Sequence, residues 1–173
     1  ILAYHDRSDG GLFVTVVEMC FAGRVGCTMD ISSLSPGADS IEILFNEELG
    51  CVIEVAEDDL EKIESVFKGH GVPVYQIARV VPRFSGSRSD QITIKSGESI
   101  IFDSTLSSLY KAWSETSYQI QRLRDNPECA DSEFEFLLSD YTSSPGLCEY
   151  FTIDMDIPAV VSQVIENRPR VAI

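Results

Sequence analysis

The stretch that decides the fold lies near the start of the chain and reads Tyr4-His5-Asp6-Arg7-Ser8-Asp9-Gly10-Gly11-Leu12. It leads into an apolar run over residues 12–21 in which only Thr15 and Glu18 are polar. A helix with apolar residues on every side has no face suited to water. The sequence therefore predicts a helix over residues 11–22 that is buried nearly all round.

The entrance of that helix has residues suited to binding phosphate. Asp9 or Ser8 can cap the helix, which leaves the amides of Gly10, Gly11 and Leu12 pointing outward at the positive end of the helix dipole. Glycine lets an anion approach the backbone without a Cβ in the way. An ordinary capped helix explains the same residues, so the pattern by itself leaves both interpretations open.

A carboxylate just ahead of the helix adds a metal to the phosphate interpretation. Mg²⁺ in proteins usually takes one or two carboxylates, with phosphate oxygens and water as its other ligands. Asp6 precedes Ser8 by two residues and can reach a Mg²⁺ ion that bridges phosphate oxygens. His5 and Arg7 are candidates for further polar contacts to the anion.

Outward from this stretch, periodicity and turn residues predict the remaining elements. Further helices are expected over residues 40–49, from residue 58 up to the glycines at 69 and 71, and over residues 104–124. Strands are expected over residues 23–30, 51–56, 72–80, 91–95 and 99–103, the last two as a hairpin.

Helix ends are predicted from capping residues. Gly50 is expected as a left-handed C-cap of the second helix. Asp58 and Glu61 have the spacing of a capping box at the start of the third. Ser104 is expected to cap the long helix, and Asn126-Pro127 to halt it.

The fold class that follows is α/β (α+β), with a mixed sheet of about four strands covered by helices. Residues 1–139 are expected to form one domain. Periodicity fades over residues 140–173, where three prolines interrupt short apolar stretches. We interpret residues 140–173 as a linker.

Composition narrows the possible partners. Twenty-eight acidic and thirteen basic residues give a formal net charge of -15, which disfavours nucleic acid and anionic lipid as partners. A local group of backbone amides can still bind one anion inside a negative protein. The sequence has no run of about 18 to 20 apolar residues, so we expect no membrane partner and a cytoplasmic location.

Several other polar and aromatic residues are given structural roles. Cys20 and Cys51 lie in apolar runs and are expected to be small buried side chains. Tyr110 and Trp113, at helical spacing, are expected in the core. His70, between two glycines, is expected to cap the C-terminus of the third helix.

Two groups of charged residues are expected on the surface rather than in a catalytic site. Glu47 and Glu48 are adjacent on the second predicted helix, and adjacent residues do not face each other on a helix. Charged residues near the end of the long helix, between residues 122 and 128, are expected to form surface or inter-domain pairs.

The segment Asp6-Arg7-Ser8-Asp9-Gly10-Gly11 resembles the D-x-S-D-G-G signature of the aminoimidazole ribonucleotide synthetase superfamily. Its members bind ATP between two homologous modules and include thiamine monophosphate kinase and selenophosphate synthetase. The signature does not choose among them. Longer matches do, and they include residues 3–12, 18–23, 44–50, 113–117, 123–131 and 168–173.

Together these matches resemble the large, multidomain formylglycinamide ribonucleotide amidotransferase family. The resemblance implies a fold like the C-terminal domain of aminoimidazole ribonucleotide synthetase. It also implies an ATP- and glutamine-dependent ligase of purine biosynthesis that converts formylglycinamide ribonucleotide to formylglycinamidine ribonucleotide. Residues 140–173 would then lead to a missing glutaminase domain, and the partners would be the other domains of the same polypeptide.

The resemblance also assigns roles to single residues. It implies that Asp6 ligates Mg²⁺ and that Ser8, with the amides of Gly10 and Gly11, contacts ATP or ADP in an auxiliary nucleotide site. The remaining ligands would lie upstream, so the isolated chain is expected to bind nucleotide weakly or not at all. Two alternatives stay open: a small-molecule kinase of the same superfamily, and a noncatalytic docking module.

Overall fold

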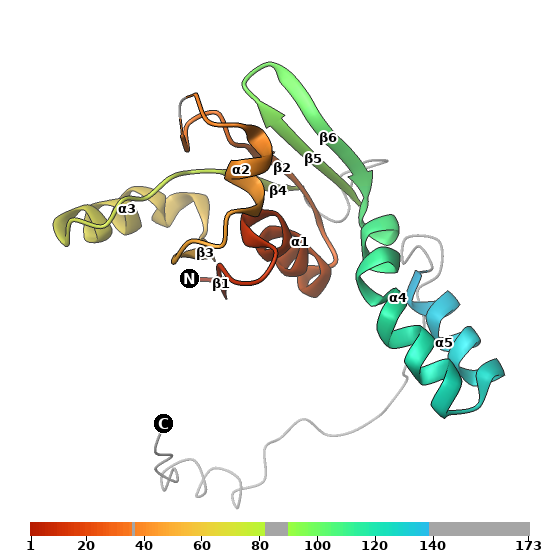
Figure 1. Ribbon diagram of the computed structural model, residues 1–173. Helices are drawn as coiled ribbons and strands as arrows, with labels where there is room; N and C mark the ends of the chain where they lie inside the picture. Colours follow the sequence, from red (N-terminus) through yellow and green to blue (C-terminus); the bar gives the residue numbers. More distant parts are fainter. Residues whose placement is uncertain (36, 82–89, 139–173) are drawn as a thin grey trace, which may run out of the picture. The chain divides into compact units, whose positions relative to one another are not determined.

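The computed structural model describes residues 1–35, 37–81 and 90–138, shown in chain order in Figure 1. Its strands are β1 (Ala3–Asp6), β2 (Gly26–Asp30), β3 (Cys51–Glu54), β4 (Ala78–Val81), β5 (Gln91–Ser96) and β6 (Ser99–Thr105). Its helices are α1 (Gly11–Gly23), α2 (Ser40–Phe45), the 3-10 turn η1 (Glu57–Asp59), α3 (Leu60–Gly69), α4 (Leu106–Arg124) and α5 (Pro127–Leu138). The predicted linker over 140–173 lies outside the described residues, so the division into 1–139 and 140–173 stays a prediction.

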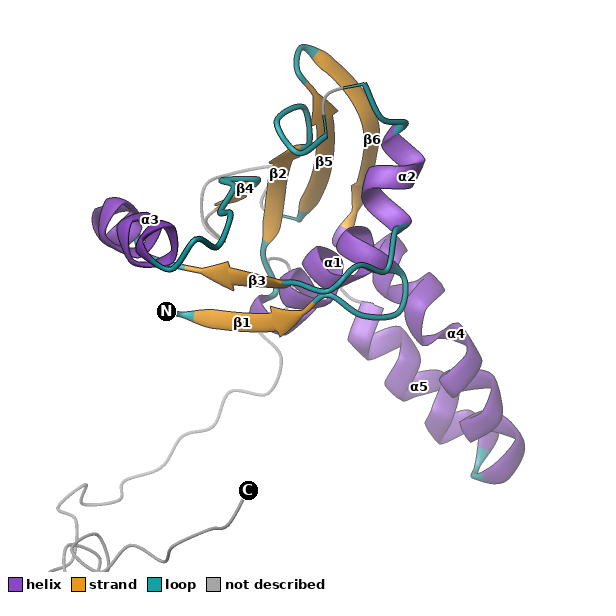
Figure 2. Ribbon diagram, turned by 60° about the vertical axis from the view of Figure 1, so that its left-hand side comes forward, coloured by secondary structure: helices purple, strands orange, loops and turns teal. Residues whose placement is uncertain are grey.

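The main sheet has four strands in the order β4-β2-β5-β6. Strand β2 pairs parallel to β5 and antiparallel to β4, and β5 pairs antiparallel to β6. The sheet is therefore mixed, and the predicted fold class is confirmed. A second sheet joins only β1 and β3, which pair antiparallel, and Figure 2 shows it as a ribbon separate from the larger sheet.

One hydrophobic core joins α1 to the main sheet. The buried apolar side chains that form it are Leu12, Val16, Val17, Cys20, Cys27, Met29, Ile31, Leu44, Ile92 and Ile94. The helix contributes Leu12, Val16, Val17 and Cys20, which lie along one side, whereas the strand segments contribute alternate residues, as their geometries require. This packing fixes α1 in the fold and with it the stretch of chain that enters the helix.

The elements with the clearest periodicity form where they were predicted. Helix α1 spans Gly11–Gly23, and β5 and β6 form the expected hairpin. The long helix α4 follows directly from β6. Its cap is Thr105, whose hydroxyl accepts a hydrogen bond from the amide of Ser108, one residue after the predicted cap at Ser104.

The second helix is shorter than predicted. Helix α2 ends at Phe45, and Asn46 after it is extended with ψ 124°, so the prediction of a helix to residue 49 capped by Gly50 is wrong. Residues 46–49 lie outside the helix, and the side chain of Glu47 accepts a hydrogen bond from the amide of Gly10 at 3.0 Å. Leu49, at the end of this stretch, is 103% exposed.

Three further expectations are corrected. The capping box is absent, because η1 precedes α3 and the cap of α3, Asp59, makes no side-chain bond. The strand predicted over 72–80 is only β4, Ala78–Val81. Cys51 is exposed, because it lies on a two-stranded sheet whose outer face is open in the described part of the chain.

Helix α5 was not predicted, although Asn126-Pro127 marks its start. The side chain of Asn126 accepts hydrogen bonds from the amides of Glu128 and Cys129, at 2.9 and 3.3 Å. Asparagine at the cap followed by proline in the first turn is a helix-start pattern. The same dipeptide that ends α4 therefore begins α5, which packs antiparallel beside α4 (Figure 1).

Candidate functional site

The candidate site lies between the end of β1 and the start of α1. Alternation along β1 places the side chain of His5 toward α1 and that of Asp6 on the opposite, exposed face. Asp6 pairs with Cys51 of β3. The pKa of Tyr4, two residues earlier on the same face, is raised by a hydrogen bond to the Asp6 carboxylate and by its charge.

The amides at the start of α1 are engaged within the chain. Gly10 donates its N–H to Glu47 Oε1 at 3.0 Å, and Gly11 donates its N–H to the carbonyl oxygen of Ser8 at 2.9 Å. The helix cap is Gly10, with no side-chain hydrogen bond, so capping by Asp9 or Ser8 is wrong. The expectation of outward-pointing free amides is wrong for Gly10 and Gly11.

The two glycines are needed for the path of the backbone. Gly10 and Gly11 have φ values of 81° and 65°, in the left-handed region that favours glycine. A Cβ on Gly10 would overlap the side chain of Val14, and one on Gly11 would lie 2.8 Å from the carbonyl oxygen of Leu44. The missing Cβ atoms therefore face protein, and they let the end of α2 pack against the start of α1.

The guanidinium of Arg7 also bonds to protein. Its Nη2 donates to the carbonyl oxygen of Ile43 at 3.3 Å, and its Nη1 lies 3.8 Å from Glu48 Oε2. Its Nε is buried without a hydrogen-bond partner. Arg7 thus ties the end of β1 to α2, and its role as a contact to an anion stays a prediction.

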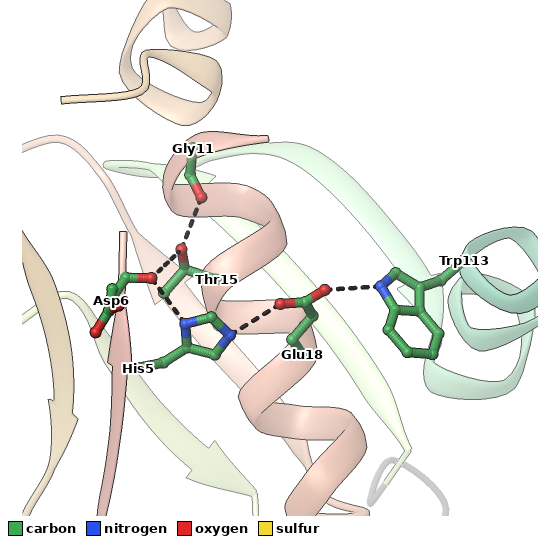
Figure 3. A network of polar contacts seen from close by, with 6 residues as sticks. All are labelled: His5, Asp6, Gly11, Thr15, Glu18 and Trp113. Atoms are coloured by element: carbon green, nitrogen blue, oxygen red, sulfur yellow. Dashed lines mark hydrogen bonds and ion pairs between the residues drawn. The ribbon is translucent and has the colours of Figure 1, made fainter. Parts of the chain in front are cut away.

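A chain of polar contacts links β1, α1 and α4 (Figure 3). His5 Nε2 lies 2.8 Å from Glu18 Oε2, and Trp113 Nε1 donates to Glu18 Oε1 at 2.7 Å. His5 Nδ1 donates to the carbonyl oxygen of Asp6 at 2.7 Å, and that oxygen also accepts from the hydroxyl of Thr15 at 3.3 Å. This network could not be predicted from local patterns, because Trp113 is 95 residues from Glu18.

Trp113 was expected in the core, and that expectation is wrong. Its side chain is 54% exposed, although its ring contacts those of Phe21 and Tyr110 at centroid distances of 5.6 and 5.7 Å. Tryptophan N–H groups usually find a hydrogen-bond partner where the ring is packed. Glu18 supplies that partner, accepting the indole N–H at 2.7 Å.

Most of the remaining polar residues have the local roles expected of them, with two exceptions. His70 caps α3 through its backbone N–H, which bonds to the carbonyl of Phe67. Arg122 pairs with Asp131 at 2.7 Å on the surface of the α4 and α5 pair. Glu47 and Glu48 are the exceptions, because both follow α2 rather than lying on its exposed face.

The site residues can be tested for their fit to a magnesium nucleotide. No group of three or more His, Cys, Asp or Glu side chains that could hold a metal occurs in residues 1–35, 37–81 and 90–138. Asp6 is exposed and fits the part of one carboxylate ligand to Mg²⁺, whose other ligands can be phosphate and water. The bonded amides of Gly10 and Gly11 do not fit an open phosphate cradle. The assignments of Asp6, Ser8, Gly10 and Gly11 stay predictions.

Comparison with known proteins gives the family. Residues 1–90, just over half of the chain, match the model described as "AIR synthase related protein, C-terminal domain". The phosphoribosylformylglycinamidine synthase of Schizosaccharomyces pombe is 43% identical over 175 residues, an alignment that covers 100% of this chain and 13% of the relative. The chain thus spans a small part of the length of that relative.

Solved structures agree on the fold. Thermotoga maritima PurL in complex with ATP superposes with a TM-score of 0.54 over 60% of this chain and 18% of that protein, at 14% identity. The same protein in complex with FGAR gives a TM-score of 0.55 over 62% of this chain and 17% of that protein, also at 14% identity. The superfamily resemblance seen at residues 6–11 is confirmed: this chain belongs to the family of AIR synthase related proteins, of which it carries the C-terminal domain.

Proposed function

We propose that this chain is one segment of an ATP- and glutamine-dependent ligase that converts formylglycinamide ribonucleotide to formylglycinamidine ribonucleotide in purine biosynthesis. The observation that carries the proposal is the alignment of the whole chain, at 43% identity, with a phosphoribosylformylglycinamidine synthase. Identity at this level extends beyond the family domain at residues 1–90. It favours this ligase over other enzymes that share the domain.

The segment contributes Asp6, Ser8, Gly10 and Gly11 to an auxiliary magnesium nucleotide site, which upstream residues complete. The exposure of Asp6 at the end of β1 supports this role, because a metal ligand has to be reachable. The contact between Gly10 and Glu47 has to open before an anion can bond to that amide. Solved complexes of PurL with ATP and with ADP show that a protein of this fold binds these nucleotides.

The segment also serves as scaffold for other domains of the same polypeptide. Among the apolar side chains of α4, Ile120 and Leu123 are 57% and 90% exposed. Exposed apolar surface on a folded domain indicates an interaction site, which supports the docking role.

Downstream lies the glutaminase domain that supplies ammonia, and the whole enzyme works in the cytoplasm. Every described helix falls short of the length and apolarity needed to cross a bilayer.

The reaction is tested on the full-length protein. Purified enzyme is incubated with ATP, Mg²⁺, glutamine and formylglycinamide ribonucleotide, and the amidine product is measured by mass spectrometry. A parallel reaction measures phosphate transfer to thiamine monophosphate. Glutamine-dependent amidine formation is expected. Phosphate transfer without amidine formation would instead identify a small-molecule kinase. If neither reaction occurs, the noncatalytic docking role is favoured.

The metal role of Asp6 is tested by Asp6→Asn in the full-length protein. This change removes the charge that would hold Mg²⁺ and keeps the shape of the side chain. We expect bound nucleotide to be lost and the melting temperature to fall. Asp9→Asn is the matched control, because Asp9 is a second exposed carboxylate of the same stretch. Unchanged nucleotide and Mg²⁺ content in Asp6→Asn would remove Asp6 from the site.

A further inference from the structure

The carbonyl oxygen of Asp6 is held by two side chains. His5 Nδ1 donates to it at 2.7 Å and the hydroxyl of Thr15 donates to it at 3.3 Å. Thr15 is buried and also donates to the carbonyl of Gly11 at 2.9 Å, so its position is fixed by α1. The peptide that follows the Asp6 Cα is therefore fastened to the first turn of α1.

His5 is held from its other side. A carbonyl oxygen only accepts hydrogen bonds, so Nδ1 carries a proton, and Nε2 faces the carboxylate of Glu18 at 2.8 Å. The imidazole thus bridges the Asp6 carbonyl and α1. A ring with both nitrogens bonded has one orientation, whereas a ring bonded at one nitrogen can tilt about that bond.

Glu18 is in turn held by α4. Its second oxygen accepts the indole N–H of Trp113 at 2.7 Å, and the indole is packed against Phe21. Figure 3 shows the consecutive contacts from Asp6 through His5 and Glu18 to Trp113. None of these three side chains reaches the exposed face of β1, on which the Asp6 carboxylate lies.

We propose that His5, Glu18 and Trp113 are positioning residues that fix the Asp6 peptide and thereby set how tightly the carboxylate of Asp6 holds a magnesium nucleotide. The proposal rests on the proposed function, which makes Asp6 a metal ligand. A peptide fixed beforehand loses less conformational freedom when the metal binds, so binding is tighter. The three residues act through the backbone and touch neither metal nor nucleotide.

The test uses three variants of the full-length protein and one control. Glu18→Ala removes the contacts to both His5 and Trp113. Glu18→Gln restores them, since the amide oxygen accepts from the indole and the amide nitrogen donates to a neutral imidazole. Trp113→Phe removes the indole N–H and keeps a smaller aromatic ring at this position. Tyr118→Phe is the control. It removes a 2.6 Å hydrogen bond from the same helix to Asp131, away from the contacts of His5, Glu18 and Trp113, which we call the relay.

Two quantities are measured that do not depend on turnover. The first is the Mg²⁺ concentration at which half of the bound nucleotide is retained after gel filtration. The second is hydrogen exchange of the backbone amides in a peptide that covers residues 1–10. We expect Glu18→Ala to raise the Mg²⁺ midpoint about tenfold, as the loss of hydrogen bonds to a charged group predicts, and to speed exchange in that peptide.

Trp113→Phe is expected to shift both quantities in the same direction but less, whereas Glu18→Gln and Tyr118→Phe stay near wild type. Suppose that Asp6→Asn loses nucleotide but Glu18→Ala and Trp113→Phe keep the wild-type Mg²⁺ midpoint. The relay is then overturned, and the nucleotide site is still supported. Nucleotide retained in Asp6→Asn overturns the site and the relay together. A midpoint raised equally by Tyr118→Phe shows a general loss of stability and also overturns the relay.

Discussion

Gly11→Ala is expected to lower stability for two separate reasons, backbone strain and overlap with α2. The residue has φ 65°, and alanine in the left-handed region costs about 1–2 kcal/mol. Its Cβ would also lie 2.8 Å from both Leu44 O and Phe45 C, which are backbone atoms that cannot rotate away. Forcing an extra methyl group into a packed site costs a further ~1–3 kcal/mol. The expected loss in the free energy of unfolding is therefore about 2–5 kcal/mol.

Gly97→Ala separates the two terms. Gly97 has φ 63°, nearly the same as Gly11, but a Cβ there meets nothing within 4 Å. Both variants change the unfolded chain in the same way, so that contribution cancels between them. The difference in free energy of unfolding between the variants is the cost of overlap with α2, expected at about 1–3 kcal/mol.

The assay is urea unfolding of the chain followed by tryptophan fluorescence, since Trp113 is its single tryptophan. The measurement is made without nucleotide, so a stability loss cannot come from a lost ligand. Equal losses in Gly11→Ala and Gly97→Ala would falsify the close approach of α2 to the start of α1. The second glycine of the motif would then need an explanation from ligand binding alone.

Two more predictions concern side chains that hold backbone amides. The pKa of Asp30 is lowered by hydrogen bonds from the amide and side chain of Ser32 and from the amide of Gly97. The ionised form of Asp30 therefore stabilises the fold above about pH 4. This contribution is lost as pH falls through the lowered pKa of the folded state. Urea midpoints of Asp30→Asn should lie below wild type at neutral pH and converge with it in acid, and parallel curves would contradict this. Asn126→Ala should cost about 1 kcal/mol by uncapping α5, measured by the same unfolding assay, with Asn126→Asp as a control that keeps the cap acceptor.

Elements with strong local periodicity could be predicted from the sequence. Helix α1 is set by its apolar run, and the β5 and β6 hairpin by two short strands around Gly97. The end of α2 could not be predicted, because it lies against the start of α1, where Gly10 bonds to Glu47, 37 residues later in the chain. Local rules describe a helix alone, and tertiary contacts decide where it ends.

The candidate site shows the same division. The residues of the stretch were identified, and the position of Asp6 just ahead of a buried helix was expected. The hydrogen-bond acceptors of the Gly10 and Gly11 amides were not predicted, because a local sequence pattern does not show which acceptor the fold brings to a donor. The relay through Glu18 to Trp113 joins segments 95 residues apart, and the spacing of polar residues along the chain carries no trace of it.

The contact between Gly10 and Glu47 bears on how a nucleotide can bind at this site. The start of a helix attracts negative charge, and here a carboxylate of the chain itself lies at the Gly10 amide, 3.0 Å away. A phosphate that bonds to that amide replaces one anion with another, so its net gain is smaller than at an open helix start. In the site that we propose, Mg²⁺ held by Asp6 would then supply most of the affinity for phosphate, because Glu47 offers no contact that replaces a metal ion. We therefore expect that removing Mg²⁺ weakens nucleotide binding more than losing the hydrogen bonds from the amides of Gly10 and Gly11 would.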